Sequence, residues 1–318
     1  MKKTLGAAMV GGVVLAISLA AAPGGAGATG AAASQPATKP PSPVADGAKP
    51  VKLAGDFKFT EGSCSDKAGN VFFIDQPNDR IMEWSVDGQL STFLHPSGYS
   101  NGMSFDAQGN LISCADEHNQ LWSIAPDKTI TVLVKDFNGK LLNGPNDVWI
   151  RPDGGMYLTD PLYARDWWNG IRDKTSQQPG KYVYFLAPDH KTLSTVITDF
   201  NTPNGIIGTP DGKTLYCSDI NGRKTWQYVI HDDGSLSDKK LFANAGSDGM
   251  TIDSDGNIYM TGRTMTIWNK EGVQLDSVQL PKSSANVCFG GKDGHMLFIC
   301  GGDSVYSLAM KTHGVGSQ

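Results

Sequence analysis

The feature that most constrains the fold of this chain is a short unit that recurs six times after residue 50. In each copy a turn centred on glycine is followed by an apolar, strand-like run, as in residues 69–74. The glycines are separated by 40, 45, 58, 44 and 38 residues: Gly69, Gly109, Gly154, Gly212, Gly256 and Gly294. Four-stranded propeller blades repeat about every 40–45 residues. A solenoid is the alternative, but a stretch of this length suits one closed ring. The repeat therefore predicts an all-β fold, a six-bladed β-propeller with four-stranded blades around a central channel.

The composition agrees with this fold class and narrows the function. No long stretch has helical periodicity, and 38 Gly and 17 Pro supply the turns that many short strands require. The net charge is −5 and no basic stripe is present, so we expect no nucleic-acid partner. Five widely spaced cysteines without a CxxC pair are expected to be buried as small apolar residues, with one disulfide left open as an alternative.

The N-terminus has the pattern of an export signal. Lys2 and Lys3 precede an uncharged apolar stretch over residues 5–22, and Ala-Gly-Ala at 26–28 offers a small-x-small cleavage site. We therefore expect a signal peptide over 1–28 and an exported protein, periplasmic or secreted. An uncleaved membrane anchor is the alternative; after cleavage no stable membrane insertion is expected. Residues 29–50 are rich in Ala, Pro and Ser and predict a disordered linker, so the propeller domain is assigned to 51–318.

A ring of polar side chains lies eight residues before each repeat glycine. All six are Glu, Asp or Asn: Glu61, Asn101, Asn146, Asn204, Asp248 and Asn286. Equivalent positions on the innermost strands of a propeller converge on its axis at one height. Their carboxylate and amide oxygens suit a hard divalent cation, Ca²⁺ first, with Mg²⁺, Mn²⁺ or Zn²⁺ as alternatives. The structural alternative is that these residues only bond turn amides at the channel mouth.

Two further features point toward the same mouth. A second acidic row ends the strand after four of the glycines, and its members could instead cap turns: Asp75, Asp116, Asp160 and Asp219. The interval of 58 residues contains an insertion over 161–180 with Arg165, Trp167, Trp168 and Arg172. Long loops on a propeller often line a binding site, although this one could be only a surface loop.

With these motifs the sequence resembles the gluconolactonase, regucalcin (senescence marker protein) and luciferin-regenerating-enzyme family, and most of all its bacterial gluconolactonase branch. Eight stretches carry the resemblance in the family's order: Thr-Glu-Gly at 60–62, Ser-Asn-Gly-Met at 100–103, Asn-Gly-Pro-Asn-Asp at 143–147, Tyr-Leu-Thr-Asp-Pro at 157–161, Pro-Asn-Gly at 203–205, Leu-Tyr-Cys-Ser-Asp at 215–219, Ser-Asp-Gly-Met at 247–250 and Asn-Val-Cys-Phe-Gly-Gly at 286–291. They cover essentially the whole expected domain.

The resemblance implies a six-bladed propeller that opens sugar lactones with one divalent cation. It implies that Glu61, Asn204 and Asp248 hold the cation and that Asp248 accepts the proton of the attacking water. The expected substrate-binding residues complete the set: Asn101, Asp116, Asn146, Asp147 and Asp160.

Two questions stay open at this stage. A cation-bound carboxylate is a weaker base, so Asp147 or Asp160 could replace Asp248 as the proton acceptor. Another metal-dependent esterase, or a propeller that only binds a ligand, could use the same channel. The chain also departs from regucalcin-like members, because the Arg that they carry two residues before the substrate Asn is Gly144 here.

Overall fold

A computed structural model describes residues 40–315 of the chain, so the expected signal peptide and residues 29–39 of the expected linker lie outside the described residues. Six four-stranded antiparallel sheets form the described domain. Blades 1 to 3 contain β2 (Thr60–Ser65), β3 (Val71–Asp75), β4 (Arg80–Trp84) and β5 (Leu90–Leu94); β6 (Ser100–Phe105), β7 (Leu111–Ala115), β8 (Gln120–Ile124) and β9 (Ile130–Val134); and β10 (Val148–Ile150), β11 (Met156–Asp160), β12 (Tyr182–Leu186) and β13 (Leu193–Ile197). Blades 4 and 5 contain β14 (Pro203–Gly208), β15 (Thr214–Asp219), β16 (Lys224–Ile230) and β17 (Leu236–Ala243); and β18 (Met250–Ile252), β19 (Ile258–Met260), β20 (Met265–Trp268) and β21 (Gln274–Val278).

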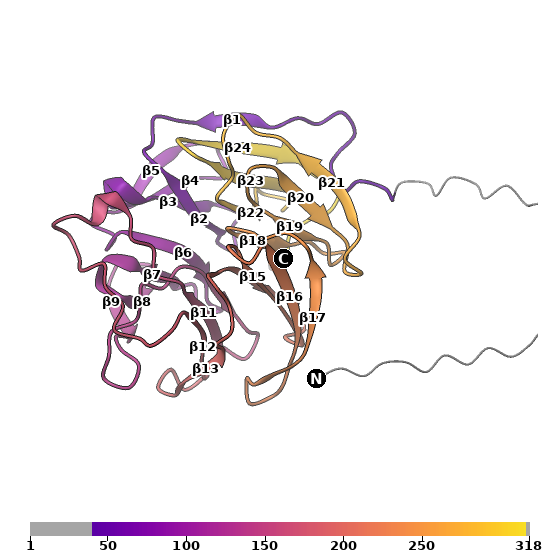
Figure 1. Cartoon of the computed structure of the whole chain (residues 1–318). Helices are drawn as coiled ribbons and strands as arrows, with labels where there is room; N and C mark the ends of the chain where they lie inside the picture. Colours follow the sequence, from indigo (N-terminus) through magenta and orange to yellow (C-terminus); the bar gives the residue numbers. More distant parts are fainter. Residues whose placement is uncertain (1–39, 316–318) are drawn as a thin grey trace, which may run out of the picture. The chain divides into compact units, whose positions relative to one another are not determined.

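The sixth blade is built from both ends of the domain. Its three inner strands are β22 (Asn286–Gly290), β23 (Met296–Gly301) and β24 (Ser304–Ala309), and its outermost strand is β1 (Val51–Ala54). Figure 1 shows this arrangement, in which the indigo β1 lies beside the yellow β24. The blades form a ring, as the repeat predicts, and the first strand of each blade packs against the first strands of its neighbours. Short 3₁₀ turns complete the described elements: η1 (Gln76–Asn78), η2 (Asp116–His118) and η3 (Asp166–Trp168).

The repeat glycines form the turns between the first and second strands of the blades. All six have a left-handed backbone, with φ from +68° at Gly294 to +89° at Gly154. Side chains other than glycine rarely adopt this conformation, which accounts for the regular recurrence of glycine. In blade 1 the turn is reinforced by Asp66, whose Oδ1 accepts the main-chain N–H of Asn70 and whose Oδ2 accepts its side-chain amide.

The apolar core is divided among the blade interfaces. In the part of the chain that the structure describes, six clusters of buried side chains each lie between two neighbouring blades. Ile74 of blade 1 packs with Met103 of blade 2, and Phe73 of blade 1 packs with Phe298 of blade 6 at 5.4 Å between ring centroids. Every blade is therefore buried on both faces, which explains strands such as β3 that are apolar almost throughout.

The folded region begins before the sequence pattern indicates. The stretch 40–50, expected to belong to a linker, contacts the last blade, because Val44 forms a β-bridge with Met310 and packs with Ala48 on a buried cluster. The prediction relied on composition, and pairing with an existing sheet edge does not require a segment that can build a core of its own. All five cysteines are buried and free. Among the described residues, no helix is both long and apolar enough to cross a membrane.

Candidate active site at the mouth of the central channel

The six polar positions found by counting lie at the start of the innermost strands. Four are on strands, Glu61 on β2, Asn101 on β6, Asn204 on β14 and Asn286 on β22. The other two, Asn146 and Asp248, lie two residues before β10 and β18. Five of the six are no more than 4% exposed, and Asp248 is partly exposed. The register of the repeat therefore places all six side chains around the axis.

Neighbouring members of the ring contact one another directly. The Asn204 amide Nδ2 donates to Asp248 Oδ1 at 2.8 Å, and the Asn286 amide Nδ2 donates to Glu61 Oε1 at 3.4 Å. These two bonds leave oxygens without a partner. Glu61 Oε2, Asn204 Oδ1 and Asn146 Oδ1 are buried and accept no hydrogen bond. A buried polar atom left unsatisfied costs about 1–3 kcal/mol, so these oxygens suit a ligand that completes the site.

The donor set fits a hard cation that takes oxygen ligands. No group of three or more His, Cys, Asp or Glu residues within 40–315 could hold a metal, so a cation at the axis needs an amide oxygen as well. Glu61, Asn204 and Asp248 offer two carboxylates and one amide oxygen, a combination that Ca²⁺ and Mg²⁺ accept. The unpaired oxygens on Glu61 and Asn204 are the observation that supports this fit.

Burial and mutual repulsion disturb the two ring carboxylates. The pKa of Glu61 lies well above its usual range because the group is buried and Asp248 and Asp147 are nearby. The pKa of Asp248 is raised by burial and is partly restored by Arg165 and by the hydrogen bond from Asn204. A cation bound between Glu61 and Asp248 would favour their ionised forms.

Asp147 follows the ring residue Asn146 and directly precedes β10. Its Oδ1 accepts the main-chain N–H of Val148 at 3.0 Å, and its Oδ2 accepts that of Ile206 at 3.3 Å. It lines a cavity of about 330 Å³ together with residues farther along the inner strands, such as Met103 and Trp149. Burial raises the pKa of Asp147 to about 8. The ring residue Asn286 lines the same cavity, so this expected substrate contact adjoins the ring and is held by main-chain groups.

Three members of the second acidic row act as turn caps. Asp160 accepts the main-chain N–H groups of Asn143 at 2.9 Å and Gly144 at 2.8 Å, and burial raises its pKa to about 7. Asp75 and Asp219 make the same kind of bond, to Lys58 and Thr202 respectively. These carboxylates hold the loops that lead into the inner strands, so Asp160 contributes to the site by shaping it.

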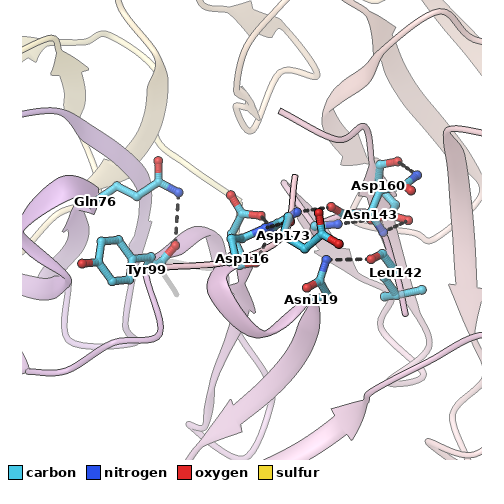
Figure 2. Close-up of polar contacts among 10 residues, drawn as sticks. Gln76, Tyr99, Asp116, Asn119, Leu142, Asn143, Asp160 and Asp173 are labelled. Carbon is cyan, nitrogen blue, oxygen red and sulfur yellow. Dashed lines mark hydrogen bonds and ion pairs between the residues drawn. The ribbon is translucent and has the colours of Figure 1, made fainter. Parts of the chain in front are cut away.

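Asp116, the fourth member, fastens the insertion. Its Oδ1 lies 2.5 Å from Nη1 of Arg172, whose Nη2 donates to the Asn143 carbonyl at 2.5 Å (Figure 2). Burial raises the pKa of Asp116 to about 6, although Arg172 acts in the opposite direction. The ion pair occupies the space in front of Gly144, where a β-carbon would meet Asp116 Oδ1 first and then Nη1 of Arg172 at 2.7 Å. The space that a side chain at position 144 would need is thus taken by Asp116 and by Arg172 of the insertion.

The insertion 161–180 lies against the channel mouth. The Tyr163 hydroxyl accepts a bond from Asn204 Nδ2 at 2.7 Å, so the loop contacts the ring itself. Trp168 is fully buried, with its ring centroid 5.3 Å from that of Tyr99 in the loop before β6. Trp167 lies 6.2 Å from the ring of Phe59, just before β2. The loop therefore spans from blade 3 to blades 1 and 2, as Figure 1 also shows.

The sequence singled out the insertion with Arg165, Trp167, Trp168 and Arg172, but not Tyr163 or its contact at Phe59. Tyr163 and Phe59 belong to no repeat, and neither is polar enough to stand out as a ligand. Only the position of Tyr163 inside the long interval could have marked it. The contact between Phe59 and the insertion links residues more than one hundred positions apart, which a local pattern does not reveal.

The fold and this site define a six-bladed propeller with an oxygen-rich pocket on its axis, a class that can bind a cation and a small hydroxylated molecule. The chain belongs to the SMP-30/gluconolactonase/LRE-like family, whose model matches residues 59–302. This confirms the family resemblance, and the membership supports a lactone hydrolase.

Individual relatives agree with the family assignment. A gluconolactonase from Zymomonas mobilis is 28% identical over 303 residues, covering 85% of this chain and 84% of the relative. The solved structure of a gluconolactonase from Xanthomonas campestris is 26% identical, with a TM-score of 0.78, covering 84% of this chain and 91% of that one. A calcium-binding regucalcin from Agrobacterium tumefaciens shares the fold, with a TM-score of 0.68 at 15% identity over 86% of this chain and 96% of that chain.

Proposed function

We propose that this protein hydrolyses a sugar lactone at the mouth of its central channel, in the manner of a gluconolactonase, with the help of one divalent cation. The observation that carries the proposal is the ring of oxygen-bearing side chains whose unpaired oxygens converge under the insertion. The family and the relatives named as gluconolactonases support the same substrate class.

We assign the cation to Glu61, Asn204 and Asp248, with Ca²⁺ as the first choice because regucalcin of the same fold is a calcium-binding protein. Mg²⁺, Mn²⁺ and Zn²⁺ are the alternatives to be tested. When bound, the cation supplies Lewis-acid polarisation of the lactone carbonyl.

The chain's own residues would orient the lactone and move a proton. Both amide atoms of Asn101 and the amide oxygen of Asn146 are buried without a partner, and such atoms suit hydroxyl groups of the substrate. Asp248 would take a proton from the attacking water as its oxygen bonds to the carbonyl carbon. The ring C–O bond then breaks, and the proton passes to the leaving oxygen, which gives the open hydroxy acid.

Of the three candidate bases, Asp248 has the most suitable position. Both oxygens of Asp147 and of Asp160 accept main-chain N–H groups, so neither carboxylate is free to approach a substrate. Asp248 is partly exposed at the mouth, and a hydrogen bond to its Oδ1 comes from Asn204.

The test is hydrolysis of glucono-δ-lactone and related lactones by the purified protein, followed by proton release. The protein is treated with EDTA, and Ca²⁺, Mg²⁺, Mn²⁺ or Zn²⁺ is then added back singly. Loss of activity with EDTA and recovery with one cation would support the proposal. If lactones are inert and an aryl or phosphate ester is hydrolysed, the site belongs to another esterase; if nothing is hydrolysed, a ligand-binding propeller is favoured.

A substitution at the proposed base gives a sharper test. We expect Asp248→Ala to lower kcat/KM by at least about 100-fold, because it removes the proton acceptor. The variant is assayed at saturating cation, and cation affinity is measured separately by calorimetry. Wild-type turnover in a folded Asp248→Ala variant would show that the assignment is wrong.

A further inference from the structure

One arginine of the insertion over the channel mouth has no carboxylate partner. Arg165 lies in the insertion and makes no ion pair within the described residues. Its Nε is buried and donates no hydrogen bond. The residue is half-buried, and an arginine without a carboxylate partner at a binding site can bind an anionic ligand.

Aromatic rings surround this guanidinium on several sides. Its central carbon lies 4.8 Å from the ring centroid of Tyr163, 5.0 Å from that of Trp167 and 5.5 Å from that of Phe59. Cation–π contacts of this kind hold an arginine in place while leaving its N–H donors unused. Tyr163 also accepts a bond from the ring residue Asn204, so this cage, made of Tyr163, Trp167 and Phe59, adjoins the proposed cation site.

The charges around the mouth do not balance once the ring holds its cation. The charges of Glu61 and Asp248 equal that of one divalent cation, and Asp116 is paired with Arg172. Arg165 adjoins the ring, because its guanidinium lies over Tyr163, whose hydroxyl accepts a hydrogen bond from Asn204. With that cation bound, neither Glu61 nor Asp248 would be left to neutralise Arg165, and its guanidinium would be available to an anionic group.

We propose that Arg165 binds an anionic group on the substrate, so that the preferred lactone carries a negative charge away from the reacting carbonyl. This inference rests on the proposed lactonase function and names its substrate class. A carboxylate, as in the lactone of a sugar dicarboxylic acid, or a phosphate ester would each supply the charge. Arginine donors match both groups in geometry.

The experiment compares neutral and anionic lactones of the same ring size. Gulono-γ-lactone is paired with glucaro-γ-lactone, which adds a carboxylate, and glucono-δ-lactone is paired with its phosphorylated derivative. We expect Arg165→Gln to lower the ratio of kcat/KM for the preferred anionic lactone to that for its neutral partner by about 10–100-fold, as for loss of a charge-assisted hydrogen bond. Arg165→Lys should retain part of the preference.

Arg151→Gln is the matched control. Arg151 also stacks on an aromatic ring, 5.6 Å from Phe185. However, it follows the last residue of β10, whereas the ring residue Asn146 lies before the first residue of that strand. The Arg151→Gln substitution removes the same charge from the protein, and we expect it to leave kcat/KM for all four lactones unchanged. An equal loss in Arg151→Gln would assign the effect to net charge and overturn the proposal.

Binding without turnover separates this inference from the proposed function. Lactam analogues resist hydrolysis, so calorimetry with neutral and carboxylate-bearing lactams in the presence of Ca²⁺ measures recognition alone. Tighter binding of the anionic lactam, lost in Arg165→Gln, would support the role of Arg165 even if no lactone were hydrolysed. Equal affinity for the two lactams, no binding of either, or a wild-type preference for neutral lactones would overturn it.

Discussion

Asp147 illustrates how the channel sets the behaviour of a single carboxyl group. It is enclosed by the inner strands, and two main-chain N–H groups are not enough to compensate for its removal from water. Its pKa is therefore raised to about 8 from an ordinary value of 3.8. The folded protein binds this proton more tightly than the unfolded chain does, so the stability due to Asp147 is present at low pH and is lost as the pH rises.

We expect the free energy of unfolding of the cation-free protein to fall between about pH 4 and pH 8 for this reason, by up to about 1.4 kcal/mol per pH unit from Asp147. Asp147→Asn should remove that share of the slope. Urea unfolding in EDTA at several pH values measures it. Asp127→Asn, at a fully exposed site, should leave the slope unchanged above pH 5. A slope identical in Asp147→Asn and wild type would contradict the assignment.

The individual residues show what the sequence could and could not predict about the site. The six ring positions follow from counting, because a propeller repeats its inner strand and carries each equivalent residue to the same height on the axis. The surroundings of Asp147, Asp160 and Asp116 do not follow from counting. All three are acidic residues at a strand end. Asp147 lines a cavity, Asp160 caps a loop and Asp116 pairs with Arg172, and these differences depend on residues elsewhere in the chain.

Among the larger elements, the insertion is held by hydrogen bonds, by the buried Trp168 and by one ion pair between buried side chains. Arg172 and Asp116 have side chains 4% and 7% exposed, so removing one partner leaves the other buried and unpaired. We expect Arg172→Met to lower the free energy of unfolding by about 3–5 kcal/mol above pH 7, and the double variant with Asp116→Asn to recover part of this. Chemical unfolding of the two single variants and the double variant gives the coupling energy.

An exposed ion pair provides the comparison for this cycle. Lys292 and Asp87 lie 2.9 Å apart but are 71% and 73% exposed, and Lys292→Met should cost no more than about 1 kcal/mol. If Arg172→Met costs as little as Lys292→Met, the insertion is not fastened by this pair.

The turns of the blades offer a prediction at the same scale. Gly69 and Gly109 have nearly the same backbone, with φ of +87° and +85°, but different neighbours. A β-carbon on Gly69 would lie 2.2 Å from the carbonyl oxygen of Gly291, whereas one on Gly109 would meet nothing within 4 Å. We expect Gly109→Ala to cost about 1–2 kcal/mol from backbone strain alone and Gly69→Ala to cost clearly more. Thermal unfolding of both variants checks this, and equal costs would contradict it.

For the molecule as a whole, the decisive step is the closure of the ring. The repeat predicts six blades, but it does not say which strand completes the last one, since β1 has only four residues and no repeat glycine. The contacts of Val44 with the last blade were missed for the same reason, because they depend on a sheet edge formed by the other end of the domain. Closure joins residues about 250 positions apart, and local patterns carry little information about such pairings.

Closure by the N-terminal part of the domain can be tested with two truncations that differ in β1 and the stretch 40–50 before it. A variant lacking residues 1–39 keeps β1 and the stretch that contacts the last blade, whereas a variant lacking 1–54 loses both. Without β1 the edge of β24 has no partner, and the clusters that contain Val44 and Ala54 lose part of their cover. We expect the shorter protein to unfold at a temperature at least about 5 °C lower, and to self-associate through the exposed edge. Calorimetry and light scattering measure the two effects; equal unfolding temperatures would mean that the ring is held by the blade interfaces alone.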